Sequence, residues 1–266
     1  MARRTRLIGL SSIFLGLIFY FCLRSTSFTS MIDSKLSPQP EWILPAPASH
    51  EENRIRTILS QKLTFLGEGQ QAIAFESEDE KYVVKFFKMR RFEPSWVDYL
   101  CPHVVRRRIR NLNWIFNGYK NAYLDLRKET GLVWIHLAKT DYLHQPITVI
   151  DQKGIEHQID ADATEFVIQE KAELIFDRLS RLYREGKVAE MESAIDRYYT
   201  FIQARMDKGY VDRDKGVTNN YGFIGERPIQ LDIGRLYKGV REGQLERIQR
   251  RVEKWRNEQL DTTPQG

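Results

Sequence analysis

The chain of 266 residues is 42% hydrophobic and 29% charged, a globular composition that excludes a disordered tail, a collagen or a disulfide-stapled mini-domain. Its net charge of +5 is concentrated at the N-terminus, where residues 1–30 hold four arginines and no acid. Residues 31–266 therefore carry only +1. A nucleic-acid-binding domain would place its charge on the folded part, so we expect no nucleic-acid partner.

The N-terminal region contains an apolar segment at residues 7–23, preceded by a basic flank at residues 1–6. The segment has no charged residue, and its length is at the low end of the roughly 17–25 residues that a membrane-spanning helix needs. We expect a single-pass membrane anchor. A cleavable signal peptide is the alternative that the same pattern allows.

A proline-rich region follows the apolar segment. Residues 24–55 contain Pro38, Pro40, Pro45 and Pro47 among serines and alanines, so they cannot form one continuous helix. We interpret them as a spacer between the membrane and a folded domain.

The first half of the folded domain is predicted to be rich in strands. Three short apolar runs, separated by turn-forming residues, indicate consecutive antiparallel strands at residues 63–67, 72–77 and 82–87. A helical region at 103–130, interrupted near Asn117-Gly118, follows them. The next elements are a predicted hairpin (147–150 with 155–159) and a further strand (164–169).

The second half changes to a helical pattern. Apolar residues recur at helical spacing from 172 to 206, with a break at Glu185-Gly186, and a charged helix is expected at 240–258. A chain with strands first and helices later is an α+β protein. We predict a β-rich lobe at 56–170, a helical lobe at 171–260 and a disordered tail at 261–266.

Two acids and an amide in the loop-rich stretch 209–235 are candidates for chemistry. Asp214 and Asn219 lie five residues apart, and Asp232 follows Asn219 after thirteen residues that include a predicted hairpin at 223–231. This arrangement brings the three side chains to one edge. Oxygen ligands of this kind suit Mg²⁺, which takes few protein ligands and lets phosphates supply others.

A second candidate constellation lies upstream. Gly67 and Gly69 stand in the turn between two predicted strands, where backbone N–H groups can approach phosphate oxygens. Lys85 follows within an apolar strand, where burying a charge is costly without a phosphate or carboxylate partner.

The order of these features resembles the protein-kinase-like superfamily. A glycine-rich turn, a strand lysine, a helical region, more strands, two helices, D-x-x-x-x-N and D-x-G follow one another between residues 60 and 236. The short segment after Gly234 and the expected anchor make the chain most similar to small membrane-associated bacterial kinases of lipopolysaccharide-core sugars (Kdo-type kinases). The resemblance implies a two-lobed kinase-like fold with a minimal C-terminal lobe.

The resemblance also implies how the chain would bind ATP. Gly67 and Gly69 would cover the nucleotide phosphates, and Lys85 would bind the α- and β-phosphates. Gln169 and Glu170 would begin the segment that meets the adenine.

The remaining implied roles concern the transfer itself. Asp214 would accept the proton of the substrate hydroxyl, and Asn219 with Asp232 would hold Mg²⁺. Glu129 is our choice for the carboxylate that pairs with Lys85, and Asp125, one turn earlier, is the alternative.

Three positions depart from the usual kinase pattern. Asp212 stands where the catalytic loop normally begins with histidine, Lys215 lies one residue nearer to Asp214 than usual, and Ala72 replaces the third glycine. The chain also has no A-P-E-like segment, so a glycan or lipid hydroxyl is expected as the acceptor rather than a protein.

Two other functions fit the same sequence: a nucleotide-binding pseudokinase and a protein-binding scaffold in the membrane. The arginines before the apolar segment favour a domain outside the cytoplasm, whereas ATP is a cytoplasmic substrate. The sequence therefore leaves both orientations open.

Overall fold

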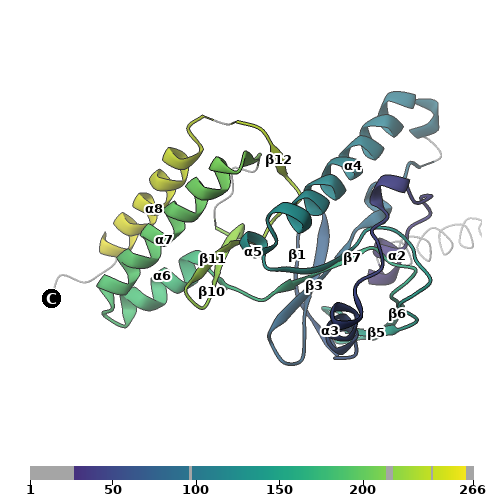
Figure 1. The fold of residues 1–266 in the computed structure, drawn as a ribbon, viewed down its shortest axis with the longest axis horizontal. Coiled ribbons are helices and arrows are strands. Elements are labelled where there is room, and N and C mark those ends of the chain that lie inside the picture. The colour runs from purple at the N-terminus through teal and green to yellow at the C-terminus, as the bar shows by residue number, and fades with distance from the viewer. Residues whose placement is uncertain (1–26, 96–97, 214–217, 241, 262–266) are drawn as a thin grey trace, which may run out of the picture.

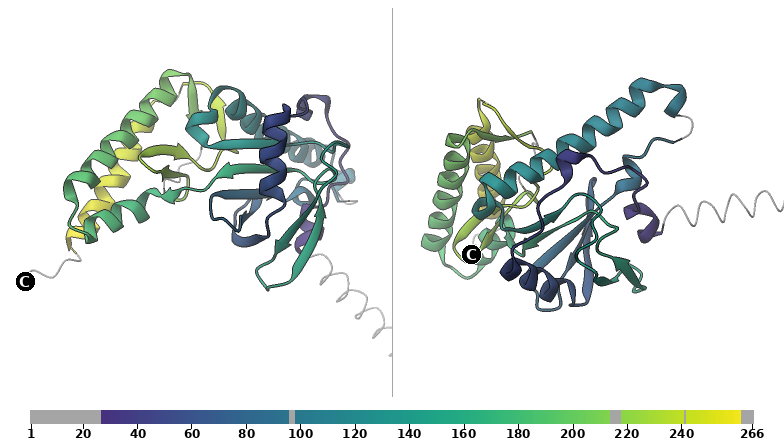
Figure 2. Two further views of the ribbon diagram at one scale, coloured as in Figure 1. Left: turned by 60° about the horizontal axis from the view of Figure 1, so that its bottom comes forward. Right: turned by 45° about the vertical axis from the view of Figure 1, so that its right-hand side comes forward.

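The computed structural model describes residues 27–95, 98–213, 218–240 and 242–261, which form a mixed α+β fold. A large sheet lies at one end and the helices α6, α7 and α8 lie side by side at the other (Figure 1). The two further views show the same separation (Figure 2). The predicted α+β class is confirmed.

The large sheet has seven strands in the order β4-β7-β3-β2-β1-β5-β6. Neighbouring strands are antiparallel except β1 and β5, which run parallel and align Leu63 with Val149. The strands are β1 (Leu63–Glu68), β2 (Ala72–Glu76), β3 (Tyr82–Phe87), β4 (Leu132–His136), β5 (Pro146–Ile150), β6 (Glu156–Asp160) and β7 (Phe166–Glu170).

Strand β4 is the element of this sheet that the sequence did not reveal. All five of its residues are buried, so it lacks the alternation that marks a half-exposed strand. Its side chains divide between two cores: Val133 and Trp134 pack with the β2–β3 aromatics, whereas Leu132 and Ile135 pack toward α4. A strand that is covered on both faces has a sequence of consecutive apolar residues, without the alternation by which strands are usually recognised.

Helix α4 (Pro102–Asp125) is continuous for 24 residues, so the predicted interruption at Asn117-Gly118 is wrong. Gly118 has another role, because a Cβ there would lie 3.0 Å from the carbonyl oxygen of Ile233 and 3.1 Å from that of Leu236. The glycine lets the helix backbone approach the segment around Asp232. A four-residue helix, α5 (Arg127–Thr130), follows α4.

The described part of the predicted spacer packs onto the large sheet and onto helix α4. Helix α2 (Phe28–Ile32), a 3₁₀ turn (Pro40–Trp42) and helix α3 (Ser49–Leu59) occupy this region. Phe28 is 6% exposed and lies in edge contact with Phe75, while Trp42 is 2% exposed against Phe116. Prolines ruled out a continuous helix but did not prevent these aromatic side chains from being buried.

No helix within the described ranges combines the length and hydrophobicity needed to cross a membrane. The predicted anchor at 7–23 lies outside the described residues.

The helical half begins shortly after strand β7. Helices α6 (Ile175–Arg184) and α7 (Val188–Asp207) are separated where the break at Glu185-Gly186 was predicted, and α8 (Gln244–Asp261) packs beside α7. Two small sheets connect this half to the large sheet. Their strands are β8 (Glu173–Leu174), β9 (Tyr210–Asp212), β10 (Tyr221–Ile224), β11 (Arg227–Gln230) and β12 (Leu236–Lys238).

Candidate functional site

A cavity of about 640 Å³ lies between the β1–β2 turn, strand β3 and the segment after β11. Its described lining includes five of the residues that the sequence singled out: Gly67, Gly69, Lys85, Asn219 and Asp232. These residues are up to 165 positions apart in the chain, and only the fold brings them to one cavity. We call it the lysine pocket.

Asp214, the predicted catalytic acid, lies outside the described residues, as do Lys215 and Gly216.

Lys85 enters the lysine pocket from the middle of β3. Its Nζ donates hydrogen bonds to Gln169 Oε1 at 2.7 Å and to the carbonyl oxygen of Leu231 at 2.8 Å. Burial lowers the pKa of the Lys85 ammonium to about 8, and the negative charge of Asp232 only partly opposes this effect. The lysine is thus held in position, but without a full counter-charge.

The predicted carboxylate partner of Lys85 is elsewhere. Glu129 lies on α5 and forms an ion pair with Lys208, while Asp125 bonds to the Tyr210 hydroxyl and pairs with Lys238 at 3.0 Å. No carboxylate among the described residues forms an ion pair with Lys85. The reason is geometric: α4 ends at Asp125, and the chain turns into α5, so these acids face the α7 and β12 side.

Tyr119 contributes the α4 side of the lysine pocket. It is buried, and burial together with the nearby negative charge of Asp232 raises the pKa of its hydroxyl. The phenol therefore stays neutral at physiological pH. Where we expected helix α4 to supply a negative charge, it supplies an aromatic wall.

Gln169 and Glu170, the predicted adenine contacts, have other partners. The Gln169 side chain is 1% exposed, and its Nε2 donates to the carbonyl oxygens of Thr130 at 2.6 Å and Gln230 at 3.1 Å. Glu170 forms an ion pair with Arg227 at 2.8 Å. Neither is part of the described lining of the lysine pocket, where Leu174 of β8 lies instead.

The segment that carries Asp232 is held by a buried polar network that the sequence did not suggest. Gln230 is fully buried, and its Nε2 donates to Asp212 Oδ2 at 3.0 Å and to the Asp232 carbonyl oxygen at 2.8 Å. Arg205, also buried, donates to Gln230 Oε1. Asp212, the residue that replaces the usual histidine, is therefore a structural acceptor. Nothing in the sequence predicts that Arg205, Asp212 and Gln230 hydrogen-bond to one another.

The glycine turn closes over one side of the lysine pocket. The Gly69 N–H donates to the Ala72 carbonyl oxygen at 2.9 Å, which forms the tight β1–β2 turn. A Cβ at Gly67 would meet no atom within 4 Å, so the backbone there is open to a ligand. Lys88 Nζ holds the turn by donating to the Gly69 carbonyl oxygen at 2.7 Å.

The Asp232 carboxylate and the Asn219 amide provide the oxygen atoms that a Mg²⁺ ion prefers. Asp232 Oδ1 accepts a hydrogen bond from the Gly234 N–H at 3.2 Å, which orients the carboxylate. Asn219 is exposed in the turn before β10. Both residues line the lysine pocket, and their oxygen atoms are of the kind that a magnesium ion takes as ligands.

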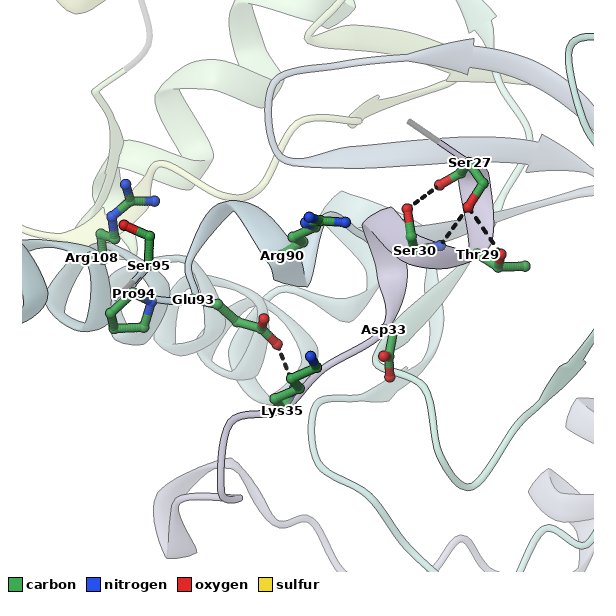
Figure 3. Close-up of a pocket in the computed structure, with 10 residues that line it drawn as sticks. All are labelled: Ser27, Thr29, Ser30, Asp33, Lys35, Arg90, Glu93, Pro94, Ser95 and Arg108. Atoms are coloured by element: carbon green, nitrogen blue, oxygen red, sulfur yellow. Dashed lines mark hydrogen bonds between the residues drawn. The ribbon is translucent and has the colours of Figure 1, made fainter. Parts of the chain in front are cut away.

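A separate pocket of about 810 Å³ lies near the first described residues, between α2 and the start of α4 (Figure 3). Charges of both signs line it, and the Lys35 backbone N–H donates to the Glu93 carboxylate. It shares no lining residue with the lysine pocket.

Comparisons with known proteins found similar solved structures only at low identity. No family model and no curated protein matches the chain. A co-crystal structure of WbdD with the kinase inhibitor LY294002 is 15% identical, with 75% of this chain and 38% of that chain covered and a TM-score of 0.37. A structure of the bifunctional kinase-methyltransferase WbdD is 14% identical, with 64% of this chain and 31% of that chain covered and a TM-score of 0.33.

A complex of Rv3197 with erythromycin, from Mycobacterium tuberculosis, is 13% identical, with 73% of this chain and 53% of that chain covered and a TM-score of 0.32. The chain thus spans between about a third and about half of the length of these proteins.

Proposed function

We propose that this protein is a kinase-like phosphotransferase that moves the γ-phosphoryl group of ATP to a hydroxyl group. The observation that carries the proposal is the convergence of Gly67, Lys85, Asn219 and Asp232 on the lysine pocket. A glycine turn, a strand lysine and two oxygen ligands at one cavity are the parts that phosphoryl transfer needs for positioning and charge neutralisation.

The electrostatics of Lys85 support a polyphosphate ligand. The ammonium is desolvated and lacks an ion-paired carboxylate among the described residues, so its charge is costly in the free protein. Phosphate oxygens beside Nζ would supply the missing counter-charge and restore the pKa. Asn219 and Asp232 would hold Mg²⁺, which neutralises charge on the phosphates when bound.

The transfer step itself needs a positioned acceptor. The acceptor hydroxyl oxygen forms a bond to the γ-phosphorus as the bond from that phosphorus to the β–γ bridging oxygen breaks and ADP leaves. In this proposal the hydroxyl proton passes to the carboxylate of Asp214, a role that rests on the motif.

We further propose that the acceptor is a glycan or lipid, of the lipopolysaccharide type, at a bacterial inner membrane. The apolar segment 7–23 would anchor the protein beside such a substrate. Carbonate extraction of the full-length protein tests the anchor: the protein should stay in the membrane pellet.

Nucleotide binding and transfer are tested separately on the full-length protein in a neutral detergent. Mg-ATP should raise the melting temperature of the wild type, and this shift should be lost in Lys85→Met and Asp232→Asn. Transfer is then followed by the appearance of ³²P from γ-labelled ATP in a lipid and glycan extract. Absence of a Mg-ATP shift in the wild type would refute the proposal.

Nucleotide binding without transfer is the second candidate, and one observation favours it. Lys85 donates to the Leu231 backbone carbonyl rather than to a carboxylate, which differs from the ion pair of active kinases. Asp214→Asn separates the two functions, because only a phosphotransferase loses its function with that change.

A further inference from the structure

A second cavity, of about 630 Å³, adjoins the lysine pocket on the other side of the β1–β2 turn. Gln70, Gln71 and Arg235 line both cavities. We propose that this cavity, which we call the arginine pocket, binds an anionic group of the phosphoryl acceptor, a phosphate or a carboxylate. The proposal rests on the proposed function and adds the chemical class of its acceptor.

Three guanidinium groups from separate parts of the chain give the arginine pocket its charge. Arg91 follows β3, Arg213 follows β9, and Arg235 follows the Asp232 segment. The described lining of the arginine pocket includes no acidic residue, and none of these arginines forms an ion pair within the described part of the chain. Three such cations at one cavity attract an anion.

Aromatic rings hold one of these guanidinium groups in place. The central carbon of Arg213 lies 3.8 Å from the ring centroid of Trp114 and 5.3 Å from that of Tyr237. These rings are themselves in edge contact, with centroids 6.3 Å apart. Stacking engages the face of the guanidinium and leaves its N–H groups available at the edge, so the group is pre-organised for an oxyanion.

The other two arginines are fixed to the turn that separates the cavities. Arg91 NH1 donates to the Gln70 carbonyl oxygen at 2.9 Å, and Arg235 NH2 lies 3.5 Å from Gln70 Oε1. The Gln71 side chain lies against Gly234, where a Cβ would come within 1.9 Å of its Oε1. An anion bound by these arginines would therefore lie beside the nucleotide phosphates.

The position of Arg213 connects the arginine pocket to the transfer step. It directly precedes Asp214, the expected proton acceptor, and its backbone N–H donates to the Arg235 carbonyl oxygen at 3.1 Å. An acceptor whose anionic group binds these arginines would be anchored next to the predicted base. The cavity thereby selects acceptors that carry a negative charge near the reacting hydroxyl.

The test measures anion binding to the full-length protein in neutral detergent, with the lysine pocket saturated by Mg²⁺ and a non-hydrolysable ATP analogue. Inorganic phosphate is titrated by ³¹P NMR, and glucuronate, titrated by calorimetry, is the carboxylate probe. At least one of the two anions should bind saturably. Arg91→Gln and Arg213→Gln should each weaken that binding about tenfold, as expected for a lost charged hydrogen bond. Arg227→Gln, outside the cavity, is the matched control and should bind like the wild type.

The result that would overturn the proposal is binding of neither anion, or binding that Arg91→Gln and Arg213→Gln leave unchanged. Loss of anion binding when the ATP analogue is added would also overturn it, because the anion would then occupy the nucleotide phosphate site. The Mg-ATP melting shift reports on the proposed function independently. If the Mg-ATP shift is absent but the arginines still bind the anion, the proposed phosphotransferase function is refuted. The anion-binding site in the arginine pocket would then still stand.

Discussion

The desolvation of Lys85 in the lysine pocket can be tested quantitatively through the pH dependence of unfolding. The pKa of Lys85 is about 8 in the folded protein, against an ordinary value of 10.5. Between these values the unfolded chain binds a proton that the folded protein has lost, so the free energy of unfolding rises with pH over this window. From pH 7 to pH 9.5 the gain from this one group is about 2 kcal/mol, since each unit of pKa difference corresponds to about 1.4 kcal/mol.

The assay is urea unfolding, followed by circular dichroism, of the wild type and Lys85→Met at both pH values. Subtracting the Lys85→Met values removes the contributions of all other titrating groups. As the pH rises, the free energy of unfolding of the wild type should increase by about 2 kcal/mol relative to that of the variant. Lys81→Met, at an exposed lysine, is the control and should follow the wild type. If the free energies of unfolding of the wild type and Lys85→Met depend equally on pH, the pKa of Lys85 is not lowered in the folded protein and the reasoning is refuted.

Three further predictions concern the surroundings of Lys85. Asp232→Asn should remove the magnesium dependence of ATP binding, measured by calorimetry, whereas Asp214→Asn should keep binding and lower turnover by roughly two orders of magnitude or more. Gly118→Ala should lower the free energy of unfolding by about 1–3 kcal/mol, because its Cβ would press on the Ile233 carbonyl oxygen, while Gly67→Ala, which has open space, should change it little. Glu129→Gln should leave nucleotide affinity unchanged and cost less than about 1 kcal/mol in urea unfolding, since Glu129 pairs with the half-exposed Lys208.

Local patterns determined much of the fold. The meander of β1, β2 and β3, the β5–β6 hairpin and the division between α6 and α7 were predictable because turn residues and side-chain periodicity act over a few neighbouring residues. The candidate site residues could be named from their order along the chain. A glycine-rich turn, a strand lysine, D-x-x-x-x-N and D-x-G follow one another as they do in the protein-kinase-like superfamily, which this order resembles.

The tertiary structure decided which groups these residues meet. Strand β4 is buried on both faces and shows no alternation, so it leaves no local pattern. The parallel pairing of β5 with β1 joins two segments far apart in the chain, so it has no local signal either. The partner of Lys85 depends on where α4 ends: the chain turns at Asp125, and Glu129 moves out of reach of the lysine pocket. Long-range contacts likewise place the buried amides of Gln169 and Gln230 behind Lys85 and Asp232. Hydrogen bonds between residues so far apart are fixed by the packing of whole elements, which the spacing of residues along one segment does not encode.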